Sequence, residues 1–195
     1  MKKCGRLKRS QGMRYTVFLD RDGVINKDSS DCIKHPSEFE FIQKSPEAVA
    51  LLTQHQFEIY LITNQSLIGR KMASQETLNA IFDKMNTGIQ AAGGKIQDIF
   101  FCPHRPDEGC YCRKPAPGMI LSARKKHGLD LERACMIGDS AKDIECARNA
   151  GCSETILVKT GNGNTALKEL QKKGITPGFI AKDLFHAARW LTKKQ

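Results

Sequence analysis

The sequence predicts an α/β protein built on a doubly wound, Rossmann-like parallel sheet. Short apolar runs of strand length alternate with helical patterns, and the connections between them are short. Parallel strands need a crossover between them, which a helix usually provides. The predicted strands are Tyr15–Leu19, Phe57–Ile62, Asp98–Phe101, Ala134–Ile137, Thr155–Val158 and a weaker sixth at Phe179–Ile180.

The helices between these strands are predicted from residues that favour helix ends. Ser45 followed by Pro46 predicts a helix with Ser45 as its N-cap and proline at the first helical position. Ser74 is expected to cap a helix over residues 75–92, which the glycine pair at Gly93 ends. Further helices are predicted from Pro117 to Gly128, from Ser140 to Gly151, and from the capping residue Asp183 through Trp190.

The length of 195 residues and the hydrophobic content of 40% favour a single globular domain. We expect this domain to span residues 13–195, after a disordered basic tail at residues 1–12 that lacks the apolar segment of a secretory signal. Residues 26–44 are irregular but too few for a cap domain, so they are expected to form a substrate-facing loop. No apolar run has the length of a membrane span. A cytoplasmic monomer is predicted.

The net charge of +10 raises the question of nucleic-acid binding. Six basic residues lie within the first fourteen positions, and the others are scattered or gathered at the C-terminus. No basic segment is interleaved with the aromatic residues on which bases stack. A solvated surface that attracts anionic substrates therefore explains the charge better than a nucleic-acid partner does.

Polar residues follow the first predicted strand as the sequence Asp20-Arg21-Asp22-Gly23. Two carboxylates one residue apart at a strand end can act as nucleophile and proton donor, with glycine where the chain turns sharply. Calcium loops and simple turns also contain such a sequence, so this feature alone does not identify a site.

Polar residues also follow the next three strands. These are Thr63-Asn64-Gln65-Ser66, then Arg113-Lys114-Pro115, then Gly138-Asp139-Ser140 with Asp143. Each group alone has a simpler interpretation as a turn, a helix cap or a solvated lysine. Since the carboxyl ends of parallel strands share one edge of the sheet, four such groups predict one site there.

In order and spacing, these groups resemble the haloacid dehalogenase superfamily of phosphohydrolases. The resemblance implies phosphoryl transfer through an aspartyl-phosphate, with Asp20 as the nucleophile and Asp22 as the general acid and base. It further implies Mg²⁺ held by Asp20, Asp139 and the backbone carbonyl of Asp22. The Thr63 hydroxyl would hold phosphoryl oxygens, and Lys114 would offset the negative charge. Asp143 is left with two interpretations, as the partner of Lys114 or a metal-bound water, or as a helix-start carboxylate.

Four soft ligands lie within eleven positions after the third strand. Cys102, His104, Cys110 and Cys112 suit tetrahedral zinc, although one intervening residue per pair is tighter than the usual finger spacing. The alternative is a loop of reduced cysteines. Because the segment leads directly into Lys114, we favour a structural zinc that fixes the position of this lysine.

Within the superfamily, this cysteine loop resembles two families, the D-glycero-D-manno-heptose 1,7-bisphosphate phosphatases and the histidinol-phosphate phosphatase domains. The heptose family is favoured by Ser66, by Ile68-x-Arg70 and by residues 113–119, Arg-Lys-Pro-Ala-Pro-Gly-Met. Leu67 and Lys71 occupy positions where that family usually has glycine, and this leaves the sugar open.

The resemblance implies Mg²⁺-dependent removal of the 7-phosphate, in the supply of heptose for lipopolysaccharide-type polysaccharides. The alternatives are histidinol-phosphate or another sugar-phosphate phosphatase, a phosphatase of nucleic-acid ends, and a non-catalytic zinc module. Arg70 is expected to bind the second phosphate. The implied substrate contacts are Asp28, Thr63, Asn64, Gln65, Ser66, Arg70, Arg113 and Lys114.

Overall fold

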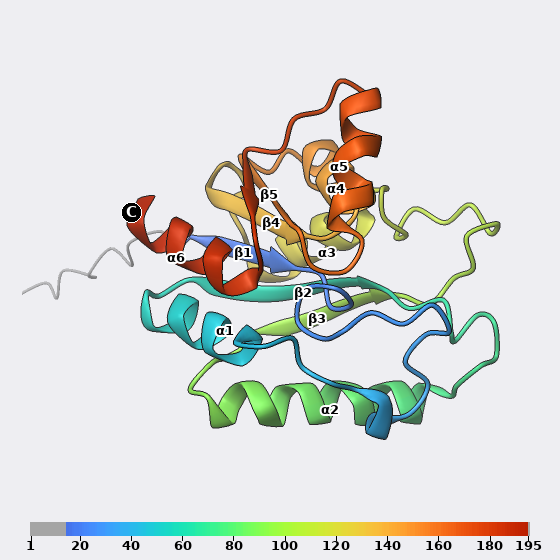
Figure 1. Cartoon of the computed structure of the whole chain (residues 1–195). Coiled ribbons are helices and arrows are strands. Elements are labelled where there is room, and N and C mark those ends of the chain that lie inside the picture. Colours follow the sequence, from blue (N-terminus) through green and yellow to red (C-terminus); the bar gives the residue numbers. More distant parts are fainter. Residues whose placement is uncertain (1–14, 195) are drawn as a thin grey trace, which may run out of the picture.

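A six-stranded parallel sheet forms the centre of the computed structural model, which describes residues 15–194 (Figure 1). The strand order is β3-β2-β1-β4-β5-β6, so the chain winds outward from the central β1 in both directions. The predicted α/β fold class is therefore confirmed. The strands are β1 (Thr16–Leu19), β2 (Glu58–Asn64), β3 (Asp98–Cys102), β4 (Ala134–Gly138), β5 (Glu154–Val158) and β6 (Phe179–Ala181).

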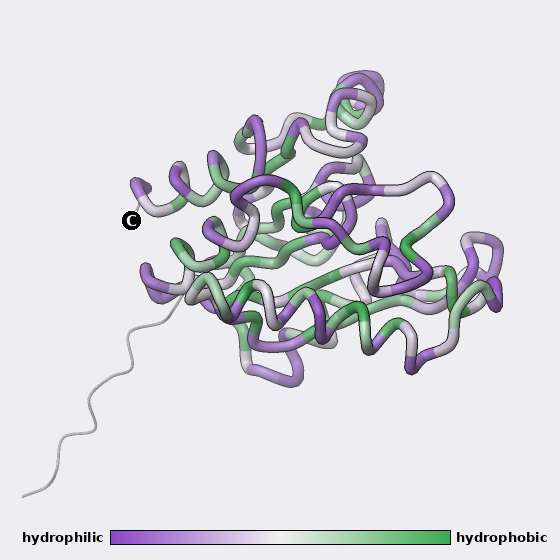
Figure 2. Tube along the Cα trace, turned by 60° about the horizontal axis from the view of Figure 1, so that its bottom comes forward, coloured by the Kyte–Doolittle hydropathy of each residue, from purple (hydrophilic) through white to green (hydrophobic). Residues whose placement is uncertain are grey.

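The strands are apolar on both faces because helices cover both sides of the sheet. In β1, Val17 and Leu19 face one core, whereas Phe18 faces the other, and none of these side chains is exposed. The pairing of β1 with β2 on one side and β4 on the other explains why this short strand is fully buried. In Figure 2 the hydrophobic stretches run through the middle of the molecule and the hydrophilic ones lie mainly outside.

Three helices pack on each face of the sheet (Figure 1). One face carries α1 (Ser45–Gln54), α2 (Gln75–Ala91) and α6 (Leu184–Lys194). The other carries α3 (Gly118–His127), α4 (Ala141–Ala150) and α5 (Gly163–Lys172). Short 3₁₀ helices lie at Pro36–Glu38 and Leu131–Arg133. No helix of residues 15–194 is both long and apolar enough to cross a membrane.

Most predicted helix ends are confirmed. The Ser74 hydroxyl accepts a hydrogen bond from the Thr77 amide at the start of α2, and Asp183 accepts one from the His186 amide in the first turn of α6. The cap of α1 was wrong, because Ser45 is already helical and its hydroxyl donates to the Ile25 carbonyl instead. Helix α5 was not predicted. The predicted tail at residues 1–12 lies outside the described residues.

Candidate active site

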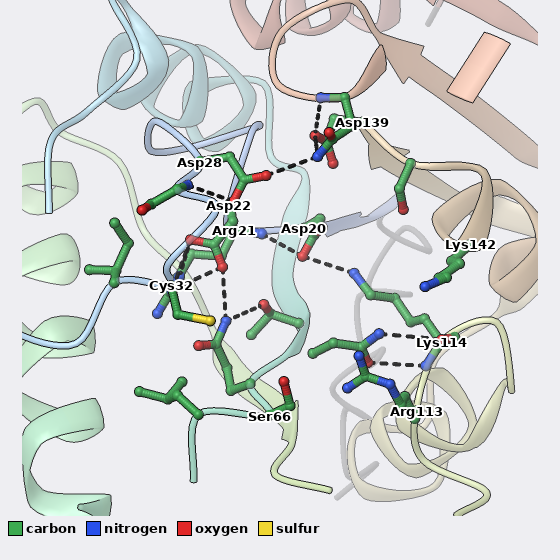
Figure 3. A pocket seen from close by; sticks show the side chains of 18 residues that line it. Asp20, Arg21, Asp22, Asp28, Cys32, Ser66, Arg113, Lys114, Asp139 and Lys142 are labelled. Atoms are coloured by element: carbon green, nitrogen blue, oxygen red, sulfur yellow. Dashed lines mark hydrogen bonds and ion pairs between the residues drawn. The ribbon is translucent and has the colours of Figure 1, made fainter. Parts of the chain in front are cut away.

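The polar residues that follow the strands gather around one cavity of about 270 Å³ at the carboxyl edge of the sheet (Figure 3). Most of the residues predicted as catalytic or substrate-binding line it. The lining residues among them are Asp20, Asp22, Asp28, Thr63, Asn64, Gln65, Ser66, Arg113, Lys114 and Asp139. Arg70 is the exception, because it lies in a separate hollow with Arg105, Pro106 and Asp107. Its position does not support the expected contact with a second phosphate.

The Lys114 ammonium lies between two carboxylates at the bottom of the cavity. Its Nζ atom is 2.8 Å from Asp20 Oδ1 and 2.6 Å from Asp143 Oδ1, and it donates to the Ile62 carbonyl at 2.8 Å. Figure 3 shows the lysine pointing at Asp20. Asp143 is fully buried and also accepts hydrogen bonds from the Ser140 amide and hydroxyl, so it both holds Lys114 and caps α4. Asp143 is therefore both a partner of Lys114 and a carboxylate that caps the start of a helix, which the sequence had offered as alternatives.

Asp20 and Asp139 form a concentration of buried negative charge. Burial, together with Asp143, outweighs the opposing charge of Lys114 and raises the pKa of Asp20 from 3.8 to about 7. Burial and repulsion from Asp20 and Asp143 raise the pKa of Asp139 from 3.8 to about 8. Lys114 alone therefore does not neutralise these carboxylates.

These carboxylates fit a divalent cation. Single oxygen atoms of Asp20, Asp139 and Asp143 all lie within 4.8 Å of one another, and hard cations such as Mg²⁺ prefer oxygen ligands. Asp143 is fully buried and does not line the cavity, whereas Asp20 and Asp139 do, so these two carboxylates remain the predicted ligands of the ion. The backbone carbonyl of Asp22 remains the predicted third ligand.

The guanidinium group of the neighbouring Arg21 holds the Asp22 carboxylate through two of its nitrogen atoms. Nε of Arg21 donates to Oδ1 at 3.1 Å, and Nη2 lies 2.8 and 2.9 Å from the two oxygens. Asn26 and Gln65 donate to the same carboxylate at 2.9 and 3.0 Å. Burial alone would raise the pKa of Asp22, but the charge of Arg21 and these hydrogen bonds lower it. Asp22 is therefore ionised in this state.

Several predicted substrate contacts already have protein partners. Gln65 is buried, and its Nε2 donates to Asp22 and to the Thr63 hydroxyl oxygen at 2.9 Å. The Asn64 side chain accepts from the Lys114 amide at 3.1 Å and donates to the Lys114 carbonyl at 3.3 Å. Asn64 and Gln65 thus position reactive residues, while Ser66 lines the cavity without such a bond.

Three cations besides Lys114 line the cavity, and one of them, Arg21, is already paired with Asp22. Arg113 donates from Nη1 to the His104 carbonyl at 3.2 Å, which ties it to the cysteine loop. Lys142, in the first turn of α4, also lines the cavity but was not predicted. A lysine in the first turn of a helix is unfavourable, because its charge opposes the helix dipole. This unfavourable position could have indicated from the sequence that Lys142 has a functional role.

The fifth strand end also contributes to the site. Asn162, which follows β5, lines the cavity and donates its backbone N–H to Asp139 Oδ2 at 2.7 Å. The sequence contained an indirect signal, because Thr160-Gly161-Asn162 follows a predicted strand just as the four recognised groups do.

The four predicted zinc ligands come together next to this cavity. Sγ of Cys112 lies 3.3 Å from Sγ of Cys102, 3.4 Å from Sγ of Cys110 and 3.2 Å from Nδ1 of His104. Tetrahedral zinc separates its sulfur and nitrogen ligands by roughly 3.5–3.8 Å, given zinc bonds of about 2.0–2.3 Å. The three distances in the structure are a few tenths of an ångström shorter than this, and all four ligand atoms lie within 4.8 Å of one another, so the cluster is compatible with a zinc site whose four ligands leave no position open for substrate.

The chain is similar to known phosphatases along most of its length. A family model described as HAD-hydrolase-like matches residues 111–187. D-glycero-beta-D-manno-heptose-1,7-bisphosphate 7-phosphatase of Bordetella bronchiseptica is 41% identical over 179 residues, 91% of this chain and 98% of that protein. The alpha-anomer phosphatase of Photorhabdus laumondii is 40% identical over 153 residues, 75% of this chain and 83% of that protein.

A solved structure agrees with these sequence matches. The D,D-heptose 1,7-bisphosphate phosphatase from B. bronchiseptica, complexed with magnesium and phosphate, has a TM-score of 0.87 and 40% identity. The match covers 93% of this chain and 99% of that structure. The sequence, the fold and the site geometry thus agree, and this chain belongs to the D-glycero-D-manno-heptose-1,7-bisphosphate 7-phosphatase family within the haloacid dehalogenase superfamily.

Proposed function

We propose that this protein is a Mg²⁺-dependent phosphatase that removes the 7-phosphate of D-glycero-D-manno-heptose 1,7-bisphosphate. The observation that carries the proposal is Asp20, a buried carboxylate beside both Lys114 and Asp139 at the bottom of a cavity lined by cations. Relatives named for the beta and for the alpha anomer are 41% and 40% identical to this chain over the parts that they match, so both anomers belong in the test.

In the first step, an oxygen of Asp20 attacks phosphorus while the bond to the sugar oxygen breaks. Asp22 supplies the proton that the leaving oxygen needs. Lys114 stabilises the negative charge that spreads over the phosphoryl oxygens, and the Thr63 hydroxyl donates to one of them. When bound, Mg²⁺ contributes further positive charge, which lets an anionic phosphate approach the anionic carboxylates.

In the second step, water attacks the phosphorus of the aspartyl-phosphate, Asp22 takes a proton from that water, and Asp20 and phosphate are released. Asp22 must gain a proton before the first step, because Arg21, Asn26 and Gln65 keep it ionised in this state. Approach of the substrate phosphate favours the protonated acid, since a second negative charge beside Asp22 raises its pKa.

The distal phosphate of the bisphosphate needs a cation away from Asp20. Arg113 and Lys142 both line the cavity, whereas Arg70 lies outside it, and so the first two are the proposed contacts. Asp28 and Ser66 remain the proposed contacts to sugar hydroxyls.

We further propose that the cluster of Cys102, His104, Cys110 and Cys112 holds a structural zinc. The loop that it closes presents Arg113 and Lys114 to the cavity, so the ion would hold both cations in place. None of the seven described cysteines is in a disulfide, which is consistent with the proposed cytoplasmic location. A monomer is proposed.

A substrate panel tests the function. Phosphate release with Mg²⁺ is measured on both anomers of the heptose bisphosphate, on histidinol phosphate and on 3′-phosphorylated DNA. We expect the highest kcat/KM on one heptose anomer. A higher value on histidinol phosphate, or on DNA with a steep loss at high salt, would assign the enzyme to the alternative substrate instead.

A further inference from the structure

Asn162 makes hydrogen bonds to two carboxylates that the mechanism uses for different purposes. Its backbone N–H donates to Asp139 Oδ2 at 2.7 Å, and its side-chain amide donates to Asp28 Oδ2 at 2.8 Å. The same amide lies 3.4 Å from Asp139 Oδ2. Asn162, in the loop after β5, thus links the predicted metal ligand Asp139 to the predicted sugar contact Asp28. Asp28 lies 134 positions away from Asn162 in the sequence. Figure 3 shows Asp28 and Asp139 on the same side of the cavity.

The position of Asn162 is fixed by the loop that carries it. The Thr160 hydroxyl donates to the Gly23 carbonyl at 2.6 Å, which ties the loop to the Asp-x-Asp turn. Gly161 has a φ of +55°, and a Cβ atom there would lie 2.2 Å from Asp139 Oδ2 and 2.7 Å from Gly23 Cα. Only glycine fits this position, so the loop lies directly against the metal-binding carboxylate.

Residues 28–33 form the tip of the first loop, and its exposed part before Ile33 relies on this contact, because Ile33 itself is anchored in the hydrophobic core. The hydrogen bond between Asp28 and Asn162 is the only one that joins them to any described residue beyond Lys34. Their other hydrogen bonds, such as Ser29 N to Asp28 Oδ1 and Cys32 N to Ser29 O, are local. Cys32 and Ile33 are also held by packing on the core, but Asp28, Ser30 and Asp31 are exposed, and local bonds alone constrain such a segment weakly.

We propose that Asn162 is a positioning residue, whose side-chain amide holds Asp28 and the loop tip at the mouth of the cavity for contact with the sugar. This inference rests on the proposed function. The same amide also lies within reach of the Asp139 carboxylate, beside which the substrate phosphate has to bind. A hydrogen-bond donor there reduces repulsion of the anionic substrate. Replacing Asn162 by alanine removes the link to Asp28 but keeps the backbone N–H that Asp139 accepts.

The first test measures the link itself, without turnover. Hydrogen exchange of the amides of residues 28–33 is followed in the full chain with Mg²⁺. Asn162→Ala should accelerate exchange there about tenfold, in line with the loss of one charge-assisted hydrogen bond. The matched control is Asn164→Ala, an exposed asparagine two residues further on, in the first turn of α5, that does not line the cavity. The reciprocal pair Asn162→Asp with Asp28→Asn exchanges donor and acceptor, and it should restore protection.

The second test measures specificity. For Asn162→Ala, KM on the heptose bisphosphate should rise about tenfold, with a loss of kcat/KM at least fivefold larger than on p-nitrophenyl phosphate, which has no sugar hydroxyls. Mg²⁺ affinity, measured by calorimetry, should change much less than KM, because the backbone N–H to Asp139 remains.

Three outcomes would overturn the proposal. These are unchanged exchange of residues 28–33 in Asn162→Ala, equal losses on both phosphate esters, and failure of the reciprocal pair to restore protection. If the wild-type protein does not hydrolyse the heptose bisphosphate at all, the proposed function fails, whereas the exchange experiment still decides whether Asn162 holds the loop.

Discussion

Neutralising one active-site carboxylate should stabilise the metal-free protein. The change is Asp139→Asn, which keeps the shape of the side chain and an oxygen that can accept from the Asn162 amide. In the wild type, burial and the charges of Asp20 and Asp143 raise the pKa of Asp139 from 3.8 to about 8. The folded state therefore resists ionisation of this group at neutral pH.

The magnitude follows from that shift. Each pKa unit corresponds to about 1.4 kcal/mol, so ionising Asp139 in the folded state at pH 8 costs at most about 5–6 kcal/mol. The asparagine loses the attraction of Lys114 and turns a charge-assisted hydrogen bond into a weaker neutral one, which costs a few kcal/mol. We expect a net gain of about 2 kcal/mol in the free energy of unfolding, or roughly 4–8 °C in Tm for a chain of this size.

The pH dependence has a definite sign. A carboxyl group with a raised folded pKa contributes stability that is present below its unfolded pKa and is lost as pH rises through the folded pKa. For Asp20 and Asp139 this window runs from about pH 4 to about pH 7 and 8. Metal-free wild type should lose stability across the window, and the advantage of Asp139→Asn should disappear near pH 4.

The assay is thermal unfolding in chelator at several pH values, repeated with Mg²⁺. Magnesium should raise the Tm of the wild type more at pH 8 than at pH 6, because protons compete for the same oxygens, and it should raise the Tm of Asp139→Asn little. If Asp139→Asn were less stable than the metal-free wild type at pH 8, the carboxylates would not be under mutual repulsion and the reasoning would fail.

Three further predictions concern the residues around this pair. Asp20→Asn should reduce phosphate release below detection while circular dichroism stays unchanged, and full activity would exclude Asp20 as the nucleophile. Gln65→Met removes donors to Asp22 and Thr63, and it should lower kcat/KM about 10–100-fold, as expected for bonds to a charged group; the Tm of the same variant tests for a merely structural loss. Purified protein should contain about one zinc per chain by elemental analysis, and Cys110→Ala should lose it along with stability; a zinc content near zero under reducing, chelator-free conditions would contradict the site.

Local sequence patterns predicted the sheet because each strand is apolar and each crossover carries its own helix signals. They also predicted the grouping of Asp20, Lys114 and Asp139, since the end of every parallel strand leads to the same edge. The sequence failed where the outcome depended on packing between distant segments. Ser45 looked like a cap but bonds to Ile25. Helix α5 was missed for another reason, since its buried residues Gly163, Ala166 and Leu170 recur at helical spacing and the pattern was overlooked.

The sequence by itself therefore determined the fold class, the cysteine cluster and the grouping of Asp20, Lys114 and Asp139, because strand order and close spacing along the chain bring these residues together. Only the tertiary structure decided which polar side chains face the cavity and which hold one another. In the structure, Arg70 lies outside the cavity, whereas Lys142 and Asn162 line it. The Gln65 side chain donates a hydrogen bond to Asp22. The physical reason is that loop side chains are oriented by contacts with segments far away in the sequence, as the bond between Asp28 and Asn162 illustrates, and no periodicity records such contacts.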